Sequence, residues 1–114
     1  MLDIVNIYDN IFIYLITLGG FNMKQIKRAF HSDPSHAWLG VDYKELVDLG
    51  IEDKISSYSY QLGKNVYLEE DCDAPIYLNK CKANNIEVDI EYLFTDDDSF
   101  VRGLPSYNKQ GGSI

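Results

Sequence analysis

A chain of 114 residues normally forms one domain, which is large enough to bury a core without disulfides or a structural metal. Its formal charge is −8, and its hydrophobic and charged fractions of 46% and 25% are typical of a globular protein. The composition excludes a wholly disordered chain, and the acidic balance argues against a nucleic-acid-binding protein.

An apolar stretch, residues 11–18, lies near the start of the chain and has no lysine or arginine before it. A secretory signal requires a basic segment ahead of its apolar run, and a membrane-spanning helix requires about 20 apolar residues. Neither pattern is present. We therefore expect a cytoplasmic protein with no membrane association.

Residues 1–22 allow two interpretations. A Gly-Gly pair stands just ahead of Met23, and its codons can form a purine-rich ribosome-binding tract, which would make Met23 the native start and the preceding residues a translated leader. Alternatively, the segment is an N-terminal helix that packs on the core or joins two copies of the chain. The apolar residues at helical spacing are Ile4, Ile7, Ile11 and Tyr14 or Leu15.

Five segments after residue 22 have the pattern of β-strands. Residues 24–30 end at a proline-containing loop, which favours an edge strand, and residues 36–41 follow that loop. Residues 54–60 and 65–70 flank a glycine-containing turn and predict a hairpin. The clearest strand is residues 86–94, where apolar and acidic residues alternate and predict one buried and one acidic side.

Capping signals predict two helices. Asp42 and Glu45 have the spacing of a capping box, which predicts a short helix over residues 43–49. Asp73 is placed to cap a second helix, which has a proline in its first turn and ends at the asparagine pair 84–85.

The resulting order is strand, strand, helix, strand, strand, helix, strand. This order predicts an α+β fold, with a mostly antiparallel sheet of four to five strands and two helices on one face. We expect a single domain over residues 23–107 and a flexible polar tail over residues 108–114.

Acidic residues are concentrated in the second half of the chain. Residues 23–68 contain six basic and six acidic residues, whereas residues 69–98 contain ten carboxylates and two lysines, a net charge of −8. Such a field repels phosphate backbones and attracts cationic surfaces. It predicts no direct nucleic-acid binding, and it allows a docking surface for a basic protein, a divalent-cation site or an imitation of nucleic acid. The alternative is a solvated face that like charge keeps soluble.

Aromatic residues and an arginine complete the predicted partner-binding surface, because these types dominate protein interfaces. Ordinary sheet packing explains most of them equally well. The candidate residues are Glu69, Glu70, Asp71, Glu87, Asp89, Glu91, Asp96, Asp97, Asp98, Trp38, Tyr58, Tyr60 and Arg102.

Signatures of catalysis and of metal binding are weak. His31, Asp33 and His36 lie in one loop and are weak candidates for a metal site, but their spacing matches no ligand motif. Carboxylates surround Cys72 and disfavour its thiolate, so this residue is not predicted to be a nucleophile. We predict no cofactor and no catalytic residue. The alternative is a small metal-dependent or hydrolytic enzyme that uses these groups with the acidic cluster 69–71.

Three segments, HAWL (36–39), KISSYSY (54–60) and VYLEEDCD (66–73), resemble a group of small uncharacterised bacterial proteins carried on phages, plasmids and gene cassettes. The resemblance covers roughly residues 29–107. It implies no established activity and no site residue, but it favours an accessory function on a mobile element. The sequence thus predicts a non-catalytic interaction or regulatory protein that binds a basic protein through its acidic face, for example as an anti-defence protein.

Overall fold

The computed structural model describes the backbone of residues 2–8, 11–18 and 21–108 and the side chains of residues 23–108. These residues form one mixed sheet, two α-helices and one short 3-10 helix. In chain order the elements are β1 (Leu2–Tyr8), β2 (Ile11–Leu18), β3 (Phe21–Ser32), β4 (Ala37–Asp42), α1 (Tyr43–Asp48), β5 (Tyr60–Leu62), β6 (Asn65–Glu69), α2 (Ala74–Ala83), β7 (Ile86–Phe94) and η1 (Phe100–Gly103).

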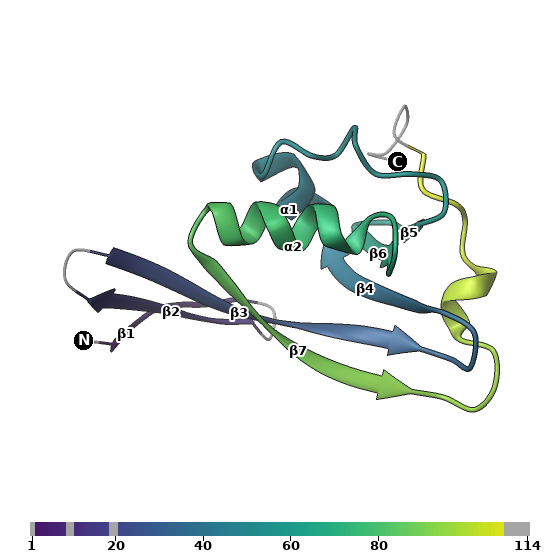
Figure 1. Cartoon of the computed structure of the whole chain (residues 1–114), viewed down its shortest axis with the longest axis horizontal. Helices are drawn as coiled ribbons and strands as arrows, with labels where there is room; N and C mark the ends of the chain where they lie inside the picture. Colours follow the sequence, from purple (N-terminus) through teal and green to yellow (C-terminus); the bar gives the residue numbers. More distant parts are fainter. Residues whose placement is uncertain (1, 9–10, 19–20, 109–114) are drawn as a thin grey trace.

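The strands follow the order β1-β2-β3-β4-β6-β5, and β7 pairs with β3 outside this path. The pairing of β3 with β7 is parallel, and the other strand pairs are antiparallel. Both helices lie on one face of the sheet formed by strands β3 to β7 (Figure 1). The predicted α+β class, with two helices on a mostly antiparallel sheet, is therefore confirmed.

The core lies between the helices and strands β4 and β6. Leu39 and Val41 of β4 point towards the helices and are buried with Val66 and Leu68 of the neighbouring strand β6. The helices contribute Leu46, Ala74, Tyr77 and Cys81 to the same cluster. Removing these side chains from water is the main force that holds the helices on the sheet.

Strand β3 lies inside the sheet, whereas the sequence predicted an edge strand over residues 24–30. One edge of β3 pairs with β7 over residues 24–32, and the other edge pairs with β2 near one end and β4 near the other. The edge prediction is wrong because Pro34 lies in the turn that follows β3. The proline marks where the strand ends and says nothing about its neighbours.

Helix α1 begins at the predicted capping box. The Asp42 carboxylate accepts the N–H of Lys44 at 3.0 Å, and the Glu45 carboxylate accepts the N–H of Asp42 at 2.8 Å. Gly50 follows the helix with a φ of +71°, which a residue without a Cβ adopts without strain. The predicted helix is confirmed, and its end lies one residue earlier than expected.

Strands β5 and β6 form the predicted hairpin, but the first strand is shorter than expected. Gly63, with a φ of +60°, is the first residue of a two-residue turn. Residues 54–59 form a loop and not a strand, because Ile55 is buried in the core and the loop is hydrogen-bonded to Asp73. Ile55 packs the loop against the core, and the sequence pattern does not distinguish such a buried loop residue from an inward residue of a strand.

Helix α2 carries the chain across the helical face of the sheet, so that β7 lies parallel to β3. The helix ends at Ala83, and Asn85, in the turn that leads into β7, has a φ of +59°. Strand β7 confirms the strand predicted over residues 86–94. Its outer edge has no partner strand among the residues that the structure describes.

The N-terminal segment contains two strands where one interpretation predicted a helix. Strands β1 and β2 form an antiparallel hairpin, and β2 pairs with the first part of β3. The helix prediction is wrong because a continuous apolar run is compatible with either element. The proposed start at Met23 stays a prediction, and the predicted tail lies outside the described residues from residue 109 on. No helix within the described ranges is long and apolar enough to cross a membrane.

Candidate functional site

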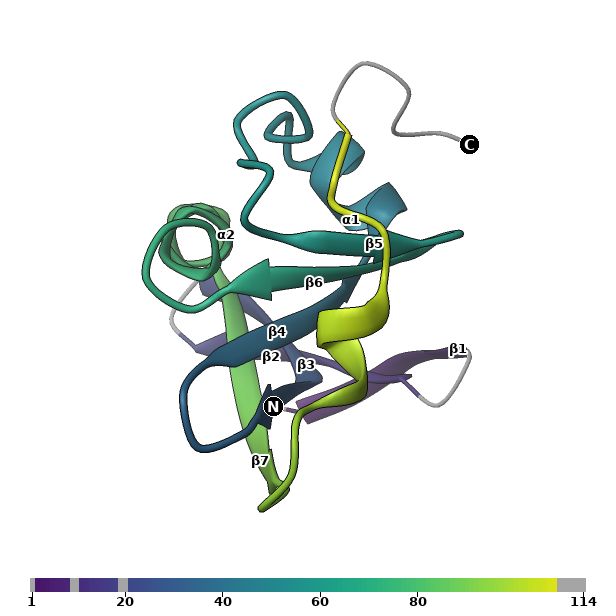
Figure 2. The same ribbon diagram turned by 90° about the vertical axis from the view of Figure 1, so that its right-hand side faces the viewer.

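The face of the sheet opposite the helices is partly covered by the C-terminal segment. Trp38 and Tyr67 alternate with core residues, so they lie on this face, beside His31 of β3. Phe100 contacts His31 and Tyr67 edge to face, with ring centroids 5.3 and 5.4 Å apart, and Figure 2 shows η1 in front of the sheet. Burial lowers the pKa of His31, against the opposing charge of Glu91, so the ring is neutral at neutral pH.

An ion pair between Asp33 and Arg102 fastens this segment to the sheet. Arg102 Nε and Nη2 lie 2.6 and 3.0 Å from the two carboxylate oxygens of the buried Asp33. The guanidinium carbon stands 5.2 Å from the centroid of the Trp38 ring. Three backbone N–H groups also donate to Asp33, those of Ser35, His36 and Ser99. Hydrogen bonding to Arg102 and these groups holds the pKa of Asp33 well below its usual range.

Three residues that were predicted to form functional sites, Trp38, Arg102 and Asp33, therefore have structural roles instead. Trp38 is 3% exposed and offers no surface to a partner. Arg102 is committed to Asp33, whose own oxygens are occupied, so Asp33 has no free acceptor for a metal. Aromatic and arginine side chains fill the interior of a sheet as readily as an interface, which is why their type alone does not separate the two positions.

The structure does not assemble the predicted set of His31, Asp33 and His36. His31 is packed under η1, and Asp33 is bound to Arg102. His36, by contrast, lies beside the acidic cluster. One of its ring nitrogens and carboxylate oxygens of Glu69 and Glu70 all lie within 4.8 Å of one another.

Asp73 is a buried anchor and does not act as the predicted helix cap. Its side chain makes no capping hydrogen bond to α2. Its carboxylate accepts the N–H of Ser56 at 3.1 Å, the hydroxyl of Ser56 at 2.7 Å and the hydroxyl of Ser59. The Ser59 hydroxyl in turn accepts the N–H of Glu69 at 2.9 Å. A buried carboxylate requires such donors, and the serines of the 54–59 loop supply them in place of the helix end.

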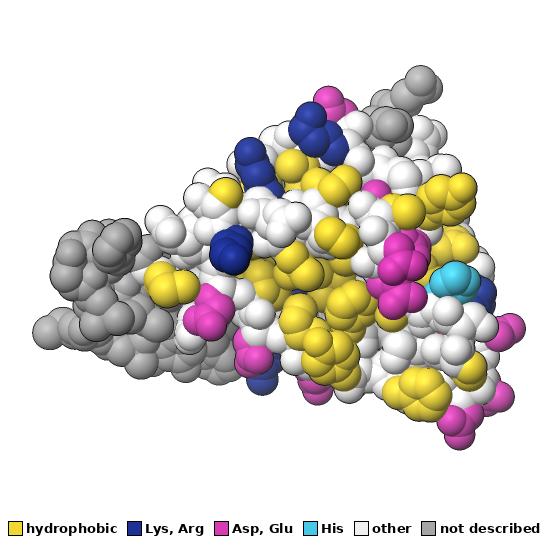
Figure 3. All heavy atoms as spheres, viewed as in Figure 1, with side chains coloured by type: hydrophobic (Ala, Val, Ile, Leu, Met, Phe, Trp, Pro, Cys, Tyr) yellow, Lys and Arg dark blue, Asp and Glu magenta, His cyan; other side chains and the backbone are white. Residues whose placement is uncertain are grey.

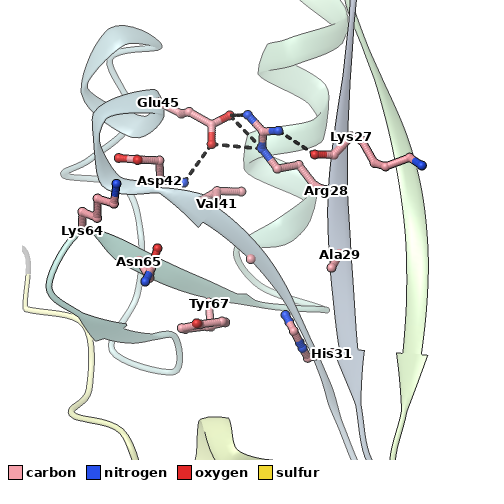
Figure 4. A pocket seen from close by; sticks show the side chains of 11 residues that line it. Lys27, Arg28, Ala29, His31, Val41, Asp42, Glu45, Lys64, Asn65 and Tyr67 are labelled. Atoms are coloured by element: carbon pink, nitrogen blue, oxygen red, sulfur yellow. Dashed lines mark hydrogen bonds and ion pairs between the residues drawn. The ribbon is translucent and has the colours of Figure 1, made fainter. Parts of the chain in front are cut away.

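A cleft of about 330 Å³ opens where β3 and β4 diverge, and an ion pair lies in it (Figure 4). Arg28 Nε lies 3.2 and 3.1 Å from the two carboxylate oxygens of Glu45, and Nη2 lies 2.7 Å from one of them. The Tyr77 hydroxyl donates to the same carboxylate at 2.6 Å. Burial and this carboxylate raise the pKa of Tyr77. The pair thus joins β3, α1 and α2, and sequence reasoning missed it.

The Arg28–Glu45 pair in this cleft has its hydrogen-bonding groups satisfied by the protein itself. The third guanidinium nitrogen of Arg28 donates to the carbonyl oxygen of Lys27 at 2.6 Å, and the second oxygen of Glu45 accepts the N–H of Asp42. Figure 4 shows the amino group of Lys27 pointing away from the pair. We interpret the cleft as a structural junction.

Strand β7 has an acidic side that faces away from the helices. Val88 and Ile90 pack against the core, so Glu87, Asp89 and Glu91 point to the opposite face, where all three are exposed. Gln25 donates to Glu87 at 2.7 Å. The three ion pairs found in the described part of the chain use none of these carboxylates. We call Glu87, Asp89 and Glu91 the acidic stripe.

The other side of β7 is apolar and becomes exposed near the end of the strand. The row that begins with the packed residues Val88 and Ile90 continues as Tyr92 and Phe94, which are 75% and 65% exposed. Phe30 lies parallel to Tyr92, with ring centroids 6.1 Å apart. Figure 3 shows hydrophobic side chains gathered on this face of the molecule. Exposed aromatic side chains next to charged ones are typical of protein interfaces.

The other predicted acidic residues lie at the end of the sheet where β3 turns into β4. Residues 96–98 follow β7, and the N–H of Thr95 donates to the carbonyl oxygen of Ser32 at the end of β3. Residues 69–71 follow β6, and the N–H of Glu70 donates to the carbonyl oxygen of Ala37 at the start of β4. No ion pair of the described residues neutralises either group.

A hollow of about 310 Å³ lies beside the cluster 69–71. Tyr58, 69% exposed, and the half-buried Tyr60 contribute to its wall, and Cys72 lies at the same hollow. Partial removal from water, a hydrogen bond to Glu69 and the nearby carboxylates raise the pKa of Cys72. The raised pKa favours the protonated thiol at neutral pH, and the absence of a nucleophile here stays a prediction.

Comparison of the chain with protein-family models, with curated proteins and with solved structures finds no match.

Proposed function

We propose that the protein is a non-catalytic interaction protein that binds a basic partner by pairing an extended segment of that partner with the outer edge of β7. The observation that supports this most directly is the combination of an edge that no described strand pairs with, an acidic stripe on one side of it and exposed aromatic residues on the other. Strand addition of this kind obtains affinity from backbone hydrogen bonds and specificity from alternate side chains.

The chemistry of β7 defines the partner segment. A strand beside β7 would present every second side chain to the acidic stripe and the others to Tyr92 and Phe94. The partner segment therefore alternates lysine or arginine with apolar residues. Basic proteins that bind nucleic acid have segments with such charges, so the proposal includes an accessory or anti-defence role on a mobile element.

A second copy of this chain is a poor partner for the same edge. If two β7 strands paired antiparallel, the two acidic stripes would lie on the same face of the joined sheet; in the register centred on Asp89, Asp89 would lie opposite Asp89 and Glu87 opposite Glu91. Like charges placed directly across a strand pair are destabilising. The stripe thus selects a cationic partner over self-association.

The test uses the full chain and a synthetic nine-residue peptide, matched to the length of β7, in which lysine alternates with valine. We expect calorimetry to show that the peptide binds and that its affinity falls as salt is raised, because salt screens exposed charge pairs. We also expect the peptide to shift the backbone amide NMR signals of residues 86–94. A peptide with glutamate in place of lysine should not bind.

Two charge-reversal variants decide whether the binding is at β7. Asp89→Lys should abolish peptide binding, whereas Asp53→Lys makes the same charge change on an exposed loop and should leave most of it. Equal affinities for the two variants, or amide shifts confined to residues outside β7, would refute the proposed site.

A further inference from the structure

We infer that His36, Glu69 and Glu70 form a binding site for a divalent transition-metal ion such as Zn²⁺. A nitrogen of His36 and one oxygen from each carboxylate lie within 4.8 Å of one another. Ligand atoms about 2.1 Å from a tetrahedral Zn²⁺ are separated by about 3.4 Å. A movement of about 1 Å, which rotamer changes of the exposed His36 and the half-buried Glu70 supply, closes the set around an ion.

The fold positions the three residues largely through contacts of their backbone atoms. Glu69 is paired with Trp38 across β4 and β6, and the N–H of Glu70 donates to the carbonyl oxygen of Ala37. The N–H of His36 is held at 3.0 Å by the buried Asp33. The two short segments that carry the ligands are therefore fixed to each other before an ion arrives, which lowers the entropic cost of binding it.

Hydrogen bonds to one oxygen of the Glu69 carboxylate orient the side chain. Its Oε1 accepts the N–H of Asp71 at 2.9 Å and the N–H of Cys72 at 2.8 Å. These bonds fix the side chain and leave Oε2 to coordinate. Support of this kind from groups around a ligand strengthens a metal site.

The charge around the set also favours a cation. Within the described residues no lysine or arginine forms an ion pair with Glu69 or Glu70, and the nearby Arg102 is committed to Asp33. Two carboxylates close together repel each other unless a positive charge lies between them. An ion at this position removes that repulsion.

The ligand types determine which ion fits. One imidazole with two carboxylates suits Zn²⁺ and its neighbours, whereas Ca²⁺ takes six to eight oxygen ligands and Mg²⁺ keeps most of its waters. Three protein ligands leave at least one coordination position open. His36 and Glu69 line the hollow together with Tyr58 and Tyr60, and this space can admit the water or small anion that would complete the coordination.

The test is titration of the full chain with Zn²⁺ alone, followed by competition with a chromophoric zinc indicator. We expect one ion per chain, and we expect His36→Asn and Glu70→Gln each to weaken binding by at least about tenfold, because even residues that only support a ligand contribute that much. Glu87→Gln, an exposed carboxylate on β7, should bind as the unchanged chain does, and so should Cys72→Ser.

Excess Mg²⁺ should not displace the Zn²⁺. The inference is overturned if the unchanged chain binds no Zn²⁺, if Cys72→Ser loses binding while His36→Asn keeps it, or if Glu87→Gln weakens binding as much as Glu70→Gln. These outcomes are independent of the peptide test, since neither His36 nor Glu70 belongs to β7.

Discussion

The two halves of the sheet differ in how completely they are covered. Strands β4 and β6 have a strand on each side, helices on one face and η1 on part of the other, and their inward side chains are almost wholly buried. Among the described residues strand β7 has one neighbouring strand and an unpaired outer edge, and its side chains are exposed on both faces. We call these regions the closed half and the open half.

This difference predicts which residues stabilise the fold and which are available for binding. In the closed half the polar groups bind each other, as Asp73 binds two serines and Asp33 binds Arg102. In the open half the acidic stripe forms no ion pair in the described part of the chain, its one side-chain hydrogen bond there is from Gln25 to Glu87, and Tyr92 and Phe94 stay exposed. Substitutions in the closed half should therefore affect folding, and substitutions in the open half should affect association.

The largest loss of stability is expected from Asp73→Ala in the closed half. The change removes three hydrogen bonds that hold the 54–59 loop and leaves the donors of the half-buried Ser56 and the buried Ser59 without this partner. We expect the free energy of unfolding to fall by about 3 kcal/mol, as is typical when a buried charged acceptor is removed. Urea denaturation measures this. A fall of less than about 1 kcal/mol would show that the loop holds itself in place.

Asp73 also shows why the elements were predictable and the site was not. Capping boxes, turn glycines and strand alternation act within a few residues, and they correctly predicted α1, the hairpin turn and β7. The Asp73 contacts span 14 and 17 residues of sequence, and nothing in the local pattern distinguishes a buried anchor from a helix cap. The parallel pairing of β7 with β3 is non-local for the same reason.

A smaller loss is expected from Glu45→Gln at the junction between the halves. The change removes the charge that pairs with Arg28, whose side chain is 9% exposed. We expect about 2 kcal/mol less stability, below the full cost of breaking a buried pair because Glu45 is 20% exposed. The matched control is Asp48→Asn, whose partner Lys44 is 77% exposed, and the expected change there is within about 0.5 kcal/mol. Similar losses for the two variants would contradict the assigned role of the cleft.

The sequence contained evidence for the Arg28–Glu45 pair that the sequence analysis did not use. Arg28 occupies an inward position of β3 between Ile26 and Phe30, and a charged residue at such a position requires a buried partner. The partner, Glu45, was correctly predicted as part of a capping box, and that role gave no reason to expect a second one. One carboxylate serves both roles, and only the fold shows the second.

Asp33→Asn should produce a still smaller and pH-dependent loss, because it releases mainly the C-terminal segment. The pKa of Asp33 is lowered in the folded protein by Arg102 and backbone donors, so its charge stabilises the fold above the unfolded pKa of about 4 and this contribution is lost as the pH falls below that value. The difference in stability between the variant and the unchanged chain should therefore be full at pH 7 and shrink below about pH 4. Thermal unfolding from pH 7 to pH 2 measures it, and a difference that does not change with pH would contradict the ion-pair role.

The smallest effect on stability, and the clearest effect on association, is expected from neutralising the acidic stripe with Glu87→Gln, Asp89→Asn and Glu91→Gln together. The three side chains are exposed, so stability should change by less than about 0.5 kcal/mol. Without like charges to oppose it, the outer edge of β7 can pair with the same edge of a second copy, helped by Tyr92 and Phe94. Sedimentation should show dimers that increase with concentration.

The control variant neutralises Asp96, Asp97 and Asp98, which lie beyond the end of β7. It changes the net charge equally, and it should remain monomeric. If both variants associate equally, net charge and not the position of the stripe keeps the chains apart, and the open half loses its assigned selectivity.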